Sequence, residues 1–147
     1  MSPETVFQLA NGAAPVAWLF MILAPRSRVV RSAILNGACV AVLAALYLLV
    51  VVAHFNMEGA DFTSLAGVTA LLSDPWAMTA GWIHYLAFDL LAGIIITKKG
   101  LGLGMHRVLL LPCQLATFML GPVGIMLFVA VAISRGARWS DLALGTP

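Results

Sequence analysis

The stretch that decides the fold is Met78-Thr-Ala-Gly-Trp-Ile-His-Tyr-Leu-Ala-Phe-Asp-Leu-Leu-Ala-Gly-Ile-Ile-Ile-Thr97. It is apolar and long enough to cross a bilayer, because about 20 apolar residues span the hydrocarbon core as a helix. Asp89 lies inside it, and an acid near the middle of a membrane helix costs about 3 kcal/mol on insertion scales. The stretch therefore predicts a membrane helix that carries a buried polar site.

Composition supports the same class of protein. Of the 147 residues, 62% are hydrophobic and only 10% are charged, and the mean hydropathy is +1.02. Soluble domains carry about a quarter charged residues, so this is an integral membrane protein whose surroundings are lipid. The basic residues form short clusters between apolar runs, which gives no surface for nucleic acid. Cys39 and Cys113 lie in apolar runs without CxxC spacing, so we expect no disulfide.

Four apolar stretches follow from hydropathy and length, at residues 6–24, 33–53, 78–97 and 108–133. They predict an all-α integral membrane bundle of four transmembrane helices. The bundle forms one membrane domain over residues 1–135, followed by a short tail at 136–147. The first residues lack the basic region of a secretory signal, so we expect the first stretch to be retained as a helix. No targeting extension precedes it, which favours a bacterial plasma (inner) membrane.

Charge predicts the orientation. Basic residues follow the first and third stretches, whereas the loop at 55–76 contains Glu58, Asp61 and Asp74 and neither Lys nor Arg. By the positive-inside rule the first and third connections are cytoplasmic, and the N-terminus and the acidic loop lie outside. A simple fourth span conflicts with this rule, because it would place Arg135 and Arg138 outside.

The fourth stretch contains Pro112 and the pair Gly121-Pro122. A proline inside a helix removes a backbone donor and clashes with the preceding turn, so we expect a kink or a break at Gly121-Pro122. A kinked single span is the expectation. The alternative is a re-entrant pair of half-helices, which would return the C-terminus to the cytoplasmic side.

The acidic loop has apolar residues at near-helical spacing, at Phe62, Leu65, Val68 and Leu72, and then the turn-forming run Ser73-Asp-Pro-Trp76. This pattern predicts a short helix on the outer membrane surface.

The polar residues of the third stretch suggest a site. Trp82, Tyr85, Asp89 and Gly93 share one helix face, and Tyr85 lies one turn before Asp89. His84 is about 140° from Asp89 around the helix, so it either borders the same cavity from another side or bonds to another helix. Further intramembrane polar residues can complete the site, because such groups need partners in lipid: Asn11, Asn36, Gln114 and Thr117.

Simpler interpretations stay open. Asp89 can be a structural group bonded to Asn36 or Gln114, and His84 can be an interhelical hydrogen-bonding group. His54 and His106 lie at opposite membrane edges in the predicted topology, which argues against a paired haem or metal ligand. Nucleotide-binding motifs are absent from the sequence. We therefore expect neither a metal nor a cofactor.

Three runs resemble the abscisic-acid-deficient-4-like membrane proteins. They are Trp82-Ile-His-Tyr-Leu-Ala-Phe-Asp-Leu-Leu-Ala-Gly93, His106-Arg-Val-Leu-Leu-Leu-Pro-Cys-Gln-Leu-Ala-Thr-Phe-Met-Leu-Gly-Pro-Val-Gly124, and the opening Leu9-Ala-Asn11 with Pro15, Trp18 and Met21-Ile-Leu-Ala-Pro25. They cover three of the four stretches in order. The plant member of the family is needed to make neoxanthin from violaxanthin, an epoxide-opening isomerisation that leaves an allene. The plastid transit peptide is absent, as expected of a bacterial relative.

The resemblance implies a four-helix membrane protein that acts on, or binds, a carotenoid or similar isoprenoid. Opening such an epoxide needs an acid near the oxygen and a base near a vinylic C–H, and it needs no redox cofactor. The hypothesis makes Asp89 the acid or proton shuttle, His84 the base and Tyr85 the orienting hydroxyl. The substrate-binding candidates are Asn11, Trp18, Asn36, Trp82, His106, Gln114 and Thr117.

Two other functions stay open. One is a non-catalytic carotenoid- or lipid-binding partner of a separate biosynthetic enzyme. The other is a small proton-coupled transport module in which Asp89 relays protons through the broken helix. Transport predicts a homo-oligomer, because four short helices rarely enclose a pore.

Overall fold

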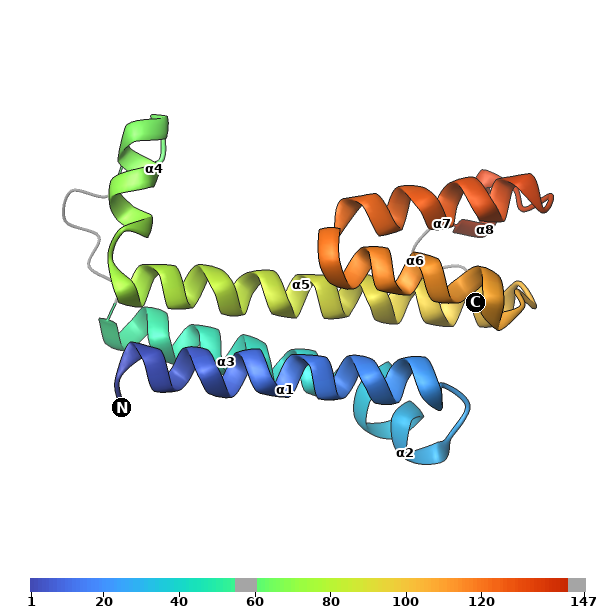
Figure 1. Cartoon of the computed structure of the whole chain (residues 1–147), viewed down its shortest axis with the longest axis horizontal. Coiled ribbons are helices and arrows are strands. Elements are labelled where there is room, and N and C mark those ends of the chain that lie inside the picture. The colour runs from blue at the N-terminus through green and yellow to red at the C-terminus, as the bar shows by residue number, and fades with distance from the viewer. Residues whose placement is uncertain (55–60, 143–147) are drawn as a thin grey trace.

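The computed structural model describes residues 1–54 and 61–142, and within these ranges the chain is helical and has no strand (Figure 1). Three described segments are long and apolar enough to cross a membrane: Pro3–Leu23, Arg28–His54 and Pro75–Gly102. They contain the long helices α1 (Pro3–Leu23), α3 (Ala38–His54) and α5 (Pro75–Gly102). Helix α5 packs against both α1 and α3. The first three predicted stretches therefore form a membrane bundle.

Helix α5 is the central element and is longer than predicted. It starts at Pro75 because the Asp74 carboxylate accepts hydrogen bonds from the N–H groups of Trp76 and Ala77, each at 2.9 Å. At 1.5 Å per residue its 28 residues measure about 42 Å, against about 30 Å for the hydrocarbon core. The helix is longer than the core is thick, and it continues past Lys98 and Lys99 to Gly102 instead of ending before them.

The second span is interrupted near its start. It consists of α2 (Arg28–Val30), a π-helical turn η1 (Arg31–Leu35) and α3. Between η1 and α3, Gly37 has a φ of +91°, a conformation that glycine adopts without steric cost. The Asn36 side-chain oxygen accepts the N–H of Ala38 at 3.0 Å. The predicted start at residue 33 thus falls inside the π turn.

The fourth stretch is not a kinked single span. It forms α6 (Arg107–Leu120) and α7 (Pro122–Ser134), which lie side by side and run in opposite directions (Figure 1). At 14 and 13 residues each measures about 20 Å, too short to cross the hydrocarbon core. The break at Gly121-Pro122 is confirmed, and the chain takes the alternative of two half-helices. The physical reason is that Gly121, with φ +41° and ψ −92°, reverses the chain instead of bending it.

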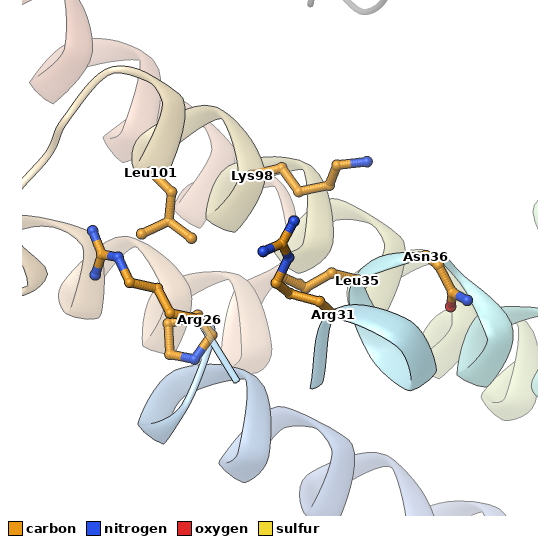
Figure 2. Close-up of a pocket in the computed structure, with 7 residues that line it drawn as sticks. Arg26, Arg31, Leu35, Asn36, Lys98 and Leu101 are labelled. Atoms are coloured by element: carbon orange, nitrogen blue, oxygen red, sulfur yellow. The ribbon is translucent and has the colours of Figure 1, made fainter. Parts of the chain in front are cut away.

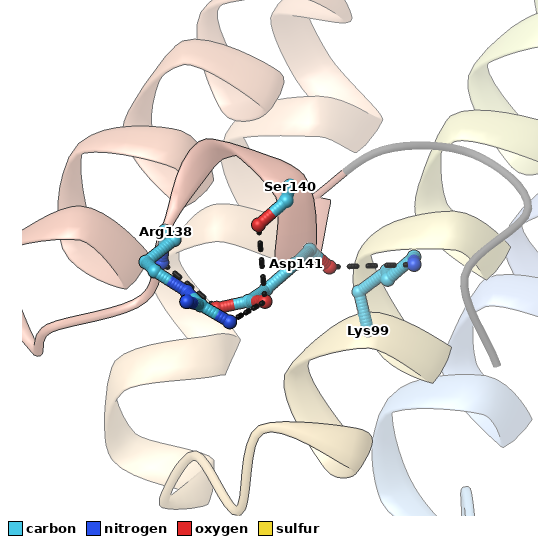
Figure 3. Close-up of polar contacts among 4 residues, drawn as sticks. All are labelled: Lys99, Arg138, Ser140 and Asp141. Carbon is cyan, nitrogen blue, oxygen red and sulfur yellow. Dashed lines mark hydrogen bonds and ion pairs between the residues drawn. The ribbon is translucent and has the colours of Figure 1, made fainter.

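The hairpin brings the basic residues together. All eight Lys and Arg lie in the last turns of α5, in α2 and η1, at the start of α6 or in the connections beside these elements. These parts meet at the end of the bundle where α1 and α5 finish (Figure 1). Figure 3 shows Lys99 Nζ donating to the Asp141 carbonyl oxygen at 3.3 Å, and Arg138 lying 3.9 Å from the Asp141 carboxylate. Asp141 belongs to α8 (Trp139–Leu142). The conflict between Arg135, Arg138 and the charge rule is thereby removed.

A short helix is present where the acidic loop predicts one, as α4 (Leu65–Leu72), and Ser64 caps it by accepting the N–H of Gly67 at 3.0 Å. Its place on the outer membrane surface stays a prediction. In Figure 1 it projects from the end of the bundle opposite the basic end. Glu58 and the rest of 55–60 in the predicted outer loop lie outside the described residues, as do residues 143–147 of the predicted tail.

Candidate functional site

The candidate site forms where α5 meets the turn between α6 and α7. Asp89 lies near the middle of α5 and is only 9% exposed. A Cβ atom added at Gly121 would lie 2.7 Å from its Oδ1 atom, so the carboxyl group lies directly against the backbone of that turn. Gly121 is thus required both for its positive φ and for this close approach. The intramembrane acid and the Gly-Pro break, far apart in sequence, meet in the fold.

The second carboxyl oxygen of Asp89 is the most unusual atom of the site. Oδ2 is buried and has no hydrogen-bond partner among the described residues. Buried polar atoms almost always have a partner, so each exception calls for an explanation. The structural interpretation, in which Asp89 bonds to Asn36 or Gln114, is not supported, because neither side chain forms a hydrogen bond with Asp89; Asn36 bonds to Ala38 and Gln114 to Thr97. Asp89 Oδ2 is therefore a buried acceptor that no hydrogen bond from the described residues satisfies.

Tyr85 accompanies Asp89, as its position one turn earlier predicts. Its hydroxyl donates to the carbonyl oxygen of Met119 at 3.4 Å, and it is close enough to the Asp89 carboxyl group to interact with it. At 3.4 Å the bond to Met119 is long for a hydroxyl donor. The Met119 carbonyl therefore holds the Tyr85 hydroxyl only weakly.

Trp82 extends the site along α5. Its ring centroid is 5.4 Å from that of Tyr85, and its Nε1 atom donates to Asn11 Oδ1 of α1 at 3.0 Å. Met78 lies one turn earlier on the same face and is exposed. Together Met78, Trp82, Tyr85 and Asp89 form a continuous row, which we call the α5 stripe.

His84 is not part of this site. Its side chain is exposed, and its ring lies 4.5 Å from that of Phe88 and 5.6 Å from that of Tyr47 on α3. It therefore contacts another helix, on a different side of α5 from the turn that Asp89 faces. The structure does not bring the predicted acid and base together.

Trp18, Gln114 and Thr117 hold the helices around the site. Trp18 is 3% exposed, and its indole ring occupies the space where a Cβ atom at Gly93 would lie. Gln114 Nε2 donates to Thr97 Oγ1 at 2.7 Å. Thr117 Oγ1 donates to the Cys113 carbonyl at 2.8 Å. Trp18 therefore packs α1 against α5 and Gln114 joins α6 to α5, whereas the Thr117 bond lies within α6.

Asn36 and His106 lie at the basic end, away from Asp89. Asn36 bonds to the start of α3, as described above, and His106 Nδ1 accepts the N–H of Val108 at 3.4 Å at the start of α6. Each of these two side chains accepts a hydrogen bond from a backbone N–H group. The described residues contain no group of three metal-ligating side chains.

The sequence did not predict that backbone groups form part of the site. The Met119 carbonyl and Gly121 come from the α6–α7 turn, and only the Gly-Pro pair pointed to that turn.

Comparison with known proteins gives one match. A family model described as ABA DEFICIENT 4-like matches residues 5–128. No curated protein and no solved structure matches the chain. The matched range includes both Asp89 and Gly121.

Proposed function

The chain belongs to the ABA DEFICIENT 4-like family, and from this premise we propose that it is a membrane isomerase acting on a carotenoid or a similar isoprenoid. Family membership and the three apolar spans identify a membrane protein and are consistent with a carotenoid-related role. One observation carries the finer proposal: the buried Asp89 Oδ2 atom has no partner in the described structure and lies at a helix break.

The proposed reaction uses the two oxygens of one carboxyl group. Opening an epoxide towards an allene adds one proton to the epoxide oxygen, breaks one C–O bond and removes one vinylic proton. The protons balance, so no redox reagent is consumed. Protonated Asp89 gives its proton from one oxygen, and the other oxygen takes the proton that the substrate loses. This is general acid–base catalysis by a single group.

This scheme replaces the predicted pairing of Asp89 with His84. Tyr85 keeps its proposed role as the orienting hydroxyl, because it interacts with Asp89 and its bond to Met119 is long. His84 points to Tyr47 of α3, so we do not assign it the base.

The α5 stripe supports the placement of a rod-shaped substrate. The α6–α7 hairpin covers only the half of α5 nearest the basic end (Figure 1). A polyene lying along Met78, Trp82 and Tyr85 would bring its end group to Asp89. Aromatic and sulfur-containing side chains suit such an apolar, polarisable chain.

We also propose a bacterial inner-membrane location with the N-terminus outside. The support is that all eight basic residues lie in or beside the elements that meet at the opposite end of the bundle, which the positive-inside rule assigns to the cytoplasm.

The test is a pigment profile. The chain is expressed in bacteria that make violaxanthin, and separately zeaxanthin, and the pigments are separated by chromatography. We expect a new isomer peak with wild type that is lost in Asp89→Asn and retained in His84→Ala. Asp141→Asn, which removes an acid from the basic end, is the matched control. Unchanged pigments with wild-type protein present in the membrane would exclude activity on both substrates.

A second function, binding without chemistry, is favoured by one feature. An apolar pocket of about 280 Å³ lies between α1, α3 and α5 and is lined by Ala13, Ala17, Cys39 and Leu43, among others. Pigment that co-purifies with Asp89→Asn, but not with Ala13→Phe, would support a carotenoid- or lipid-binding partner of a separate enzyme.

A further inference from the structure

A second pocket lies at the basic end of the bundle, away from Asp89. Its volume is about 640 Å³, and Figure 2 shows the side chains that line it. Three are cationic and come from different parts of the chain: Arg26 follows α1, Arg31 belongs to η1 and Lys98 to α5. Leu35 and Leu101 give it an apolar part. The lining of the pocket therefore combines three cationic side chains with two apolar ones.

No acidic side chain among the described residues neutralises the positive charge of this pocket. No acidic residue lines it, and within the described residues neither Arg26, Arg31 nor Lys98 forms an ion pair. Arg138, in contrast, pairs with Asp141 nearby. Grouped like charges repel one another, so an anion in the pocket would be favoured by all three cations.

An unusual backbone turn supplies two of the residues that line the pocket. Arg31 and Leu35 are the first and last residues of the π turn η1, and single π turns are rare and occur frequently at functional sites. Leu35 is buried, whereas the Arg26, Arg31 and Lys98 side chains are exposed. Asn36 uses its amide oxygen to bind the N–H of Ala38, which leaves its NH₂ group as a further donor. Buried Leu35 therefore anchors one side of the pocket, while the three cationic side chains remain accessible to solvent.

We propose that this pocket binds a phosphate-bearing anion, supplied either as the head group of an anionic membrane lipid or as a soluble phosphate ligand. Guanidinium groups bind phosphate through paired N–H donors, and Lys adds a point charge. Basic pockets between the ends of membrane helices bind anionic lipid head groups. Leu35 and Leu101 suit the glycerol and acyl part of such a lipid. The site is separate from Asp89 and does not depend on the proposed isomerase.

Binding is measured on the purified full chain in neutral detergent by native mass spectrometry and by titration. The probes are dioleoyl phosphatidylglycerol, dioleoyl phosphatidylcholine and inorganic pyrophosphate. The double variant Arg31→Gln/Lys98→Gln removes two pocket charges. Arg28→Gln/Arg107→Gln removes the same charge from the same end outside the pocket and is the matched control. All four side chains are exposed, and gel filtration with circular dichroism verifies the fold of each variant.

We expect wild type to retain phosphatidylglycerol over phosphatidylcholine. The pocket variant should bind it roughly 30-fold more weakly, from about 1 kcal/mol per basic residue at a membrane surface, and the control by less than about 3-fold. If pyrophosphate fails to compete, the source is lipid. If pyrophosphate binds, competes and shows the same loss in the pocket variant, the source is a soluble phosphate ligand. Equal losses in both double variants, or no preference for either anion, would overturn the proposal.

Discussion

Replacing Asp89 should make the protein more stable while it abolishes activity. A buried polar atom without a partner costs about 1–3 kcal/mol, and Asp89 Oδ2 is such an atom. Asp89→Leu removes this cost and keeps an apolar side chain of similar size. We therefore expect the free energy of unfolding to rise by about 1 kcal/mol or more. Asp89→Asn keeps the shape and should change stability less.

The measurement is reversible unfolding of the purified protein in mixed micelles as the fraction of denaturing detergent rises. Leu90→Ala is the control, because Leu90 is fully buried beside Asp89 on the same helix. Truncating a buried leucine should destabilise by about 2–5 kcal/mol. If Asp89→Leu and Asp89→Asn both lower stability by more than about 1 kcal/mol, the carboxyl group is a structural hydrogen-bonding group and the reasoning for a functional acid fails.

Three further predictions concern other parts of the chain. Gly93→Ala should lower the free energy of unfolding by about 1–3 kcal/mol through overpacking, because a Cβ atom there would overlap the Trp18 indole; an unchanged unfolding midpoint would contradict this packing. Hydrogen bonds from Ser64 and then Thr63 lower the pKa of Asp61 from 3.8 to about 2. The order they give to the start of α4 should therefore be complete above pH 4 and lost as the pH falls through about 2, which amide exchange at Gly67 measures. In a background with both cysteines replaced by alanine, Arg138→Cys should react with an impermeant thiol reagent only after the cells are opened; reaction in intact cells would indicate a full fourth span.

The sequence located the polar centre of the site because helix periodicity is local. Tyr85 and Asp89 are one turn apart, and this spacing alone places them on one face. The same geometry separated His84 from Asp89. The hypothesis that His84 is the base rests on the family's chemistry. In the fold the His84 ring packs against Tyr47 of α3, and no local sequence pattern reveals such a contact between helices.

The path of the chain in the fourth stretch also could not be predicted from local sequence alone. Gly121-Pro122 predicts a break, but whether the chain bends or reverses depends on how α7 packs back on α6. A Cβ atom at Gly124 would meet Thr117 Oγ1, so the two half-helices approach closely only because residue 124 is glycine. Asn36 and His106 were candidates for the site because they are polar residues beside apolar stretches. In the fold each accepts a backbone N–H at the start of a helix, α3 and α6 respectively.

The half-length hairpin gives the molecule an unequal cross-section. In the half of the bundle nearest the basic end, the described α6–α7 hairpin lies beside α5, together with α1 and the short turns α2 and η1, whereas α3 lies mainly in the other half beside α1 and α5 (Figure 1). The protein is thus a wedge, wider in one leaflet than in the other. Asp89 lies at the step between the two widths, because its carboxyl group lies against Gly121 of the hairpin turn. For the proposed isomerase, this predicts that a lipid-dissolved substrate approaches from the narrow leaflet without entering water.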